Sequence, residues 1–242
     1  MCAILLSVTH IAIVGKERAM SKFELRERAF QAGGVTYEES LEATQLVPSL
    51  YERLGRESGM ELLSRLFYDR VFGDDSEKHQ WFLSIFASST KEEAIDNQFR
   101  FFVQTFGGPD LYRQKGKGKF TRLAGRHANY PIGHRAAERW VMHMEHAIDE
   151  HPELKLNNST RIRSCRCDDA QSSDSDSDTT VATPATADEE CDNTNSEKMI
   201  AETREAMLSY FKYTAHYIVV ASEYMRDDQL SGGTRVDEGR VW

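Results

Sequence analysis

The chain has 242 residues, and its 30 Lys and Arg are outnumbered by 39 Asp and Glu, which leaves a formal charge of −9. This length allows one domain with extensions or two small domains, and the acid excess argues against a general nucleic-acid-binding protein, which needs clustered basic side chains. Ten of the acidic residues fall in the segment 168–197, which contains no Lys or Arg. Without this segment the formal net charge changes from −9 to +1. The remainder of the chain is near neutral, and with 40% hydrophobic residues overall it can form a packed core.

Residues 1–45 are predicted to form a disordered leader that contains one weak helical stretch, residues 22–32, before Gly33-Gly34. The apolar run over residues 2–14 is shorter than the roughly 20 residues that a membrane-spanning helix needs. The run also lacks the positively charged start of a signal peptide and the Arg- and Ser-rich composition of a transit peptide. We therefore expect a cytoplasmic protein that binds no membrane, with organellar targeting by the leader left open.

Four cysteines are too few for a disulfide scaffold, and three of them lie in or beside the acidic stretch, which suits a reducing compartment. Cys165 and Cys167 are separated by one residue and are a candidate metal pair, but no pair of histidines accompanies them. We interpret them as loop residues without a metal. Ser173, Ser175 and Ser177 are acid-flanked candidates for phosphorylation, in a segment that we interpret mainly as a solvated spacer.

A helical pattern begins near Ser49 and marks the first part of a domain over residues 46–156. A short helix stops at Gly55, and Ser58 is the predicted N-cap of the next helix. The apolar residues of that helix recur at spacings of three and four, the period of a buried face. They are Met60, Leu63, Phe67 and Val71. A capping box over residues 89–92 opens a further helix, which ends at Gly107-Gly108-Pro109.

Two more long helices are predicted after a basic, Gly-containing loop over residues 110–119. The first carries apolar residues at helical spacing over residues 137–148. Residues 157–198 form a Ser/Thr/Asp/Glu-rich insertion that cannot bury enough apolar surface to fold and is predicted to be disordered. The last helix, residues 199–227, is expected to fold back on helix 137–148 to cover its apolar face, followed by a polar tail at 228–242. The pattern thus predicts an all-α domain of five or six helices.

Four motifs, in order and at fitting distances, resemble the truncated (two-over-two) haemoglobins of group II, in particular their plant and algal members. They are Phe67-Tyr68-x-x-Val71, Gly107-Gly108-Pro109-x-x-Tyr112, Arg126-His127, and Trp140 thirteen residues after His127. The resemblance covers about residues 49–149 and resumes over about 204–224. It implies a truncated globin fold, a two-over-two helical sandwich around haem b (iron protoporphyrin IX).

The resemblance also implies a role for each matching residue. His127 matches the proximal histidine and is the implied metal ligand, because a neutral imidazole nitrogen binds iron and leaves the opposite axial position open. Tyr68 matches the distal tyrosine and Trp140 the tryptophan of group II. The hydroxyl of the first and the indole N–H of the second can donate hydrogen bonds to dioxygen.

Five further residues match positions around the haem. Ala94 matches the small residue at the distal gate, and Gln98 matches a distal glutamine of plant-like members. Phe86 matches the aromatic residue on the haem face. Tyr112 and Arg126 match positions near the haem propionates, where a cation beside a carboxylate is favourable. The loop before Arg126 is two residues longer than usual, and its Gly and Lys residues can absorb this insertion without displacing the iron ligand.

The implied function is reversible binding of O2, and of CO and NO, in oxygen or NO sensing, scavenging or transport. The alternative is a haem redox enzyme, namely an NO dioxygenase, peroxidase or nitrite reductase, with a separate reductase because the chain contains no flavin or ferredoxin motif. A third reading is a haem-free helical interaction domain that acts through the acidic insertion. His143 and His146 are a candidate metal pair that we interpret as solvated side chains. The oligomeric state is left open.

Overall fold

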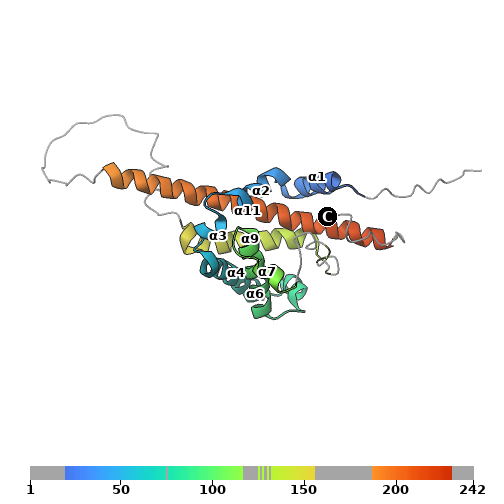
Figure 1. Cartoon of the computed structure of the whole chain (residues 1–242). Helices are drawn as coiled ribbons and strands as arrows, with labels where there is room; N and C mark the ends of the chain where they lie inside the picture. Colours follow the sequence, from blue (N-terminus) through green and yellow to red (C-terminus); the bar gives the residue numbers. More distant parts are fainter. Residues whose placement is uncertain are drawn as a thin grey trace, which may run out of the picture.

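The structure is a computed structural model that describes residues 20–74, 76–116, 125, 127, 130, 132–155 and 187–230, with side chains of the last range described over 195–226. Every regular element in these ranges is helical, as predicted (Figure 1). The elements are α1 (Lys22–Gly33), α2 (Tyr37–Gln45), α3 (Leu50–Arg53), α4 (Arg56–Gly73), α5 (Gln80–Leu83), η1 (Ser84–Phe86), α6 (Lys91–Thr105), α7 (Leu111–Gln114), α9 (His134–Glu150), η3 (Pro152–Leu154) and α11 (Ala187–Leu230). None of these helices is long and apolar enough to cross a membrane.

The core is formed where α4 contacts α6 and α9, and where α9 contacts α11. All four predicted face residues of α4 are completely buried there, namely Met60, Leu63, Phe67 and Val71. Two caps differ from the prediction by a few residues. Gly55, in the left-handed conformation, is the N-cap of α4 instead of Ser58, and the capping box of α6 pairs Thr90 with Glu93, one residue later than predicted.

The Gly-Gly-Pro segment ends α6 and lets the chain turn back toward α3. Gly107 has φ of +98°, and a Cβ on Gly108 would lie 2.7 Å from both Val103 and Tyr51 side-chain atoms. The Tyr51 amide donates to the Phe106 carbonyl at 3.1 Å, which ties α3 to the end of α6. Glycine is therefore required here by close approach of the chain as well as by the turn.

The helical stretch predicted over residues 22–32 is confirmed as α1, but the prediction of disorder is wrong for residues 37–45, which form α2. Each helix opens with a complete capping box, on Ser21 and on Thr36, and both helices contact α11. Their apolar faces are narrow, which made the sequence pattern weak, but Leu25 and Ala29 of α1 are completely buried. Burial against α11 supplies the stabilisation that local propensity does not. Residues 1–19 lie outside the described residues.

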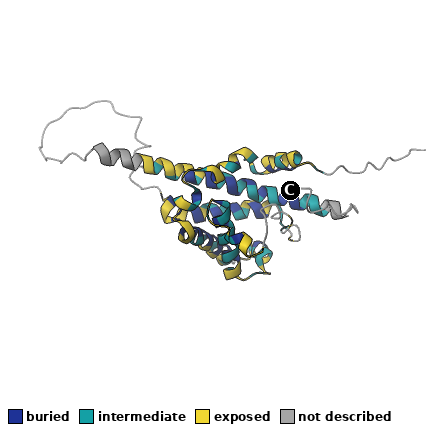
Figure 2. Cartoon of the chain, viewed as in Figure 1, coloured by how far each residue is buried: buried dark blue, intermediate teal, exposed yellow. Residues whose placement is uncertain are grey.

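The last helix begins earlier than predicted. α11 starts at Ala187, so the expectation of disorder up to residue 198 is wrong for residues 187–198, and 157–186 lie outside the described residues. The predicted return of this helix onto α9 is confirmed. Figure 2 shows α11 buried along its middle, between α9 on one side and α1 and α2 on the other, and exposed toward its start.

Gly59 marks the tightest approach inside α4. A Cβ at this position would overlap the carbonyl oxygen of Leu54, the last residue before the turn into α4. The Gly59 carbonyl also lies 3.1 Å from Nε2 of His151, which is completely buried at the end of α9. Because a carbonyl oxygen can only accept, Nε2 carries the proton of this neutral imidazole. Gly59 thus lies where α3, α4 and the end of α9 meet.

We predict that Gly59→Ala destabilises the protein by about 1–3 kcal/mol, the usual cost of forcing extra atoms into a packed site. Gly73→Ala is the matched control, because Gly73 ends the same helix and a Cβ there meets nothing within 4 Å. The control should be neutral or stabilising by up to about 1 kcal/mol, since alanine is the better helix former. Denaturant unfolding followed by circular dichroism measures both. Equal midpoints for Gly59→Ala and wild type would contradict the close approach.

Candidate functional site

A cavity of about 250 Å³ lies among the helices, and six of the eight predicted site residues line it. They are Tyr68, Phe86, Gln98, Tyr112, His127 and Trp140. These residues come from α4, η1, α6, α7 and α9 and from the segment between α7 and α9, so the fold brings together positions that are up to 72 residues apart in the chain. None of the described lining residues is charged. Uncharged walls of this kind suit a flat apolar group better than a free ion.

Tyr68 and Trp140 lie on either side of Phe67. The Phe67 ring centroid is 4.9 Å from each of their ring centroids, and Phe67 is completely buried. Tyr68 also contacts Phe86 edge to face at 6.0 Å. Burial raises the pKa of the Tyr68 hydroxyl, so this group stays protonated and able to donate at any pH the protein tolerates.

Three polar groups of the cavity have no hydrogen-bond partner among the described residues. They are the Tyr68 hydroxyl, the Trp140 indole N–H and the buried Oε1 of Gln98. A buried polar atom without a partner, such as Gln98 Oε1, is rare and needs an explanation. A ligand in the cavity that pairs with this oxygen's amide and with the two donors explains all three groups.

His127 lies on the cavity in a segment that α11 holds in place. The Tyr130 amide donates to the His127 carbonyl at 3.0 Å, and the two rings are 6.4 Å apart. Arg226 of α11 donates to the carbonyl oxygens of Tyr130, at 3.0 Å, and Ile132, at 3.4 Å. The guanidinium therefore fixes the short stretch between His127 and the start of α9.

Two predicted site residues are not brought to the cavity by the described structure. Ala94 is buried in the core on α6, one helical turn before Gln98, and is not among the lining residues, so its place at a gate stays a prediction. Arg126 lies outside the described residues.

The sequence analysis missed the wall that α11 contributes. The periodicity of α11 predicted an apolar face, but not which part of it would face a cavity that seven other segments also line. Its lining residues are Tyr210, Phe211, Thr214, Ala215, Ile218 and Val219. The spacing of three and four residues in this set is the signal that was present.

His143 was wrongly interpreted as solvated. Its side chain is buried, Nε2 lies 3.1 Å from Oδ2 of Asp74, and the ring stacks on Phe82 at 5.6 Å. His146 is exposed, as expected. No group of three His, Cys, Asp or Glu side chains able to hold a metal ion occurs in the described part of the chain.

The cavity fits haem in its chemistry. Aromatic and aliphatic side chains from α5, α6, α9 and α11 form its walls, as an apolar porphyrin requires, and His127 is the lining residue with an imidazole nitrogen that can bind iron. The partnerless oxygen of Gln98 and the free donors of Tyr68 and Trp140 add polar groups suited to a small ligand.

Comparison with known proteins gives a consistent result. Residues 49–167, just under half of the chain, match the family described as Bacterial-like globin. The chain is 40% identical over 138 residues to "Two-on-two hemoglobin-3" of Arabidopsis thaliana, a match that covers 57% of the chain and 74% of that protein.

Two further relatives are matched over shorter lengths. "Group 2 truncated hemoglobin 3-1" of Lotus japonicus is 44% identical over 47% of the chain and 64% of its own length. "Group 1 truncated hemoglobin" of Tetrahymena thermophila is 32% identical over 28% of the chain and 52% of its own length. The chain therefore covers less than two thirds of these two proteins.

We predict that Arg226→Gln loosens the segment after His127. Hydrogen bonds from a charged donor are worth about 1.5–3 kcal/mol, so their loss should speed exchange of the Tyr130 and Ile132 amides by about tenfold or more. Hydrogen–deuterium exchange measures this. Arg204→Gln is the control on the same helix, because Arg204 donates to the Leu154 carbonyl at 3.1 Å, and it should speed exchange near η3 instead. Unchanged exchange of the Tyr130 and Ile132 amides would contradict a restraining role for the Arg226 hydrogen bonds.

Proposed function

Because the chain belongs to the truncated (two-on-two) haemoglobins of group II, and is therefore a haem globin, we propose that it binds O2 reversibly, and CO and NO as well, in the cavity between α4, α6, α9 and α11. The observation that carries this proposal is the pairing on one cavity of a single imidazole, His127, with three uncharged hydrogen-bonding groups that have no described protein partner.

When bound, haem would supply an iron atom that takes a diatomic ligand and makes O2 more negative than CO. The His127 imidazole would hold this iron through a ring nitrogen. The chain has no Cys-x-x-Cys-His segment for covalent attachment, so we propose haem b, held by this nitrogen and by the apolar walls.

Tyr68, Trp140 and Gln98 supply the selectivity among ligands. The hydroxyl and the indole N–H donate hydrogen bonds, and the Gln98 amide can turn its NH2 group inward. Phe67, Phe82 and Phe86 keep water away from these donors, which strengthens each hydrogen bond. Donors of this kind stabilise O2 more than the less polar CO.

Strong retention of O2 favours sensing, scavenging or reaction with NO over bulk transport.

Purification of the full chain with haem, followed by ferrous, ferric and CO spectra, tests the proposal directly. A Soret band and a reversible spectral change with O2 are the expected results. A protein that acquires no Soret band when reconstituted with haem would overturn it.

We predict that His127→Ala abolishes or greatly weakens haem retention, because no other described lining residue offers an imidazole to the iron. Absorbance spectra and the rate of haem transfer to apomyoglobin measure this. His146→Ala is the control, since His146 is exposed on α9 and should be neutral. A ferrous spectrum and haem retention equal to wild type in His127→Ala would reject the assignment.

We also predict that Tyr68→Phe and Trp140→Phe each speed O2 dissociation by about ten- to a hundredfold. A hydrogen bond to a charged acceptor is worth about 1.5–3 kcal/mol, and each 1.4 kcal/mol is tenfold. CO dissociation should change far less, and the double variant should fall short of additivity because both groups share one acceptor.

Stopped-flow O2 and CO dissociation on wild type, both single variants and the double variant decides between two causes. Equal factors for O2 and CO would mean that the substitutions opened a path for the ligand. No change in O2 release would mean that Tyr68 and Trp140 do not face the ligand, even with His127 on the iron.

A further inference from the structure

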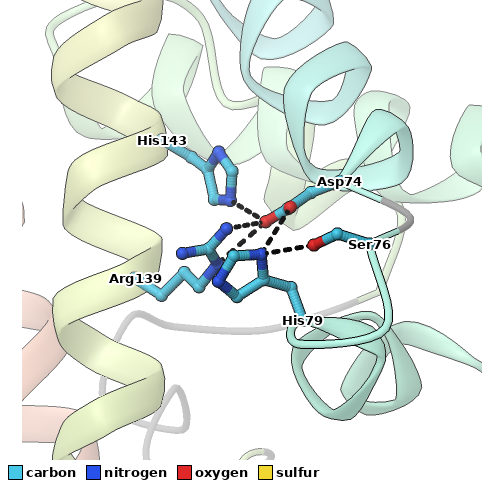
Figure 3. Close-up of polar contacts among 5 residues, drawn as sticks. All are labelled: Asp74, Ser76, His79, Arg139 and His143. Carbon is cyan, nitrogen blue, oxygen red and sulfur yellow. Dashed lines mark hydrogen bonds and ion pairs between the residues drawn. The ribbon is translucent and has the colours of Figure 1, made fainter.

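Three segments of the chain converge on the carboxylate of Asp74 (Figure 3). Arg139 donates to Oδ2 through Nε at 2.8 Å and through Nη2. His143 Nε2 lies 3.1 Å from the same oxygen, and His79 Nδ1 lies 3.0 Å from Oδ1. Asp74 follows the last residue of α4, His79 precedes α5, and the other two residues are on α9. We call these four residues the Asp74 cluster.

The Asp74 cluster is largely sheltered from water. The exposed fractions of the side chains are 14% for Asp74, 17% for Arg139 and 6% for His143. Burial alone would raise the pKa of Asp74, but the hydrogen bond and charge of Arg139, with the two imidazoles, hold it below its ordinary value. The carboxylate is therefore charged at neutral pH and serves as the acceptor for all of its neighbours.

The Asp74 cluster and the neighbouring Ser76 do not form a nucleophile site, although Ser, His and Asp lie together there. The Ser76 hydroxyl lies 2.7 Å from His79, but it approaches Nδ1, the same nitrogen that faces Asp74. Activation of a serine needs the acid and the hydroxyl on opposite ring nitrogens. The arrangement is therefore one that holds segments together.

The segments that it holds are the ones that carry the cavity donors. Asp74 ends the helix of Tyr68, and Arg139 directly precedes Trp140 on α9. His143 stacks on Phe82, whose ring centroid is 5.4 Å from that of Phe86. The Phe86 ring in turn contacts Tyr68 edge to face.

We propose that Asp74 is a positioning residue for the two cavity donors, because its contacts with Arg139, His143 and His79 fix the end of α4 and the start of α5 against α9. This inference rests on the proposed function, in which Tyr68 and Trp140 donate to O2. The polar atoms of these donors have no hydrogen-bond partner among the described residues, so their positions follow from the placement of the two helices.

Asp74→Asn tests the positioning. The amide keeps the shape of the side chain but offers one acceptor oxygen, and its NH2 group would face the Arg139 or His79 donors. Asp69→Asn is the matched control, because Asp69 lies on the same helix and also forms an ion pair with another helix, at 2.6 Å from Nζ of Lys91 on α6. Both variants lose one negative charge and one interhelical ion pair.

The first readout is NMR of the haem-free protein, which does not depend on ligand binding. Burial lowers the pKa of His143, Asp74 raises it, and Arg139 and His146 lower it. The pKa of His143 should therefore fall further in Asp74→Asn and rise in Arg139→Gln. The Trp140 indole N–H resonance, assigned with Trp140→Phe, should shift in Asp74→Asn and stay in place in Asp69→Asn.

The second readout is ligand dissociation from the haem-loaded protein. Asp74→Asn should speed O2 dissociation by about tenfold, the effect of one lost hydrogen bond to a charged acceptor, and CO dissociation by less than about threefold. Asp69→Asn should leave both rates at the wild-type values. If Asp74→Asn does not fold, Arg139→Gln breaks the same contact and takes its place in the indole and dissociation measurements, while the pKa of His143 is then expected to rise.

The outcomes separate the positioning from the proposed function. Equal acceleration of O2 and CO, or an unchanged O2 rate alongside a shifted His143 pKa, would overturn the positioning role while O2 binding stands. If wild type binds no O2, the proposed function fails, and the Trp140 resonance still decides whether the Asp74 cluster sets the place of the indole. An indole resonance that is equal in Asp74→Asn and wild type overturns the inference in either case.

Discussion

Burial of α11 on two opposite sides is the constraint on which the rest of the structure depends. One side provides Phe211 and Val219, which line the cavity opposite α4 and α6. The other side is covered by α1 and α2, where Tyr213 contacts Tyr37 at 5.7 Å between ring centroids. A helix that loses either cover exposes a continuous apolar face to water. The N-terminal helices therefore stabilise a wall of the cavity, although none of their residues lines it.

The cavity itself combines two kinds of restraint. Aromatic contacts around Phe67 and Phe82 fill the space beside the donors, and contacts of this kind set distance without fixing direction strongly. Charged contacts are made by Asp74 and Arg226, which do not line the cavity, and they fix which part of each helix faces its neighbour. The cavity walls thus stay uncharged while directional hydrogen bonds outside them hold the helices in place.

Much of the helical core could be predicted from the sequence, because apolar residues at regular helical spacing indicate which face of a helix is buried. The buried faces of α4 and α9 were predicted correctly, and the return of α11 follows from the need to cover its apolar face. The family resemblance placed Tyr68, His127 and Trp140 on one cavity before any contact was known. The weak pattern of α1 predicted a helix but not its packing, and α2 was missed. The stability of both helices comes from contacts with a helix about 180 residues later. The burial of His143 depends likewise on Asp74, which is 69 residues away and is reached only in the folded chain.

The contact between the first and last parts of the described chain determines the order in which its parts can fold during translation. The Met20 amide donates to the Tyr224 hydroxyl across 204 positions in the sequence. At roughly 5–20 residues per second, a ribosome needs roughly 10–40 s to travel that distance. Throughout this interval Leu25 and Ala29 have emerged without the surface that buries them, and the haem pocket has no α11 wall. The cofactor site is therefore completed late in the folding of the nascent chain. Chaperones that bind exposed apolar helices have time to bind α1 and α2 before α11 is made.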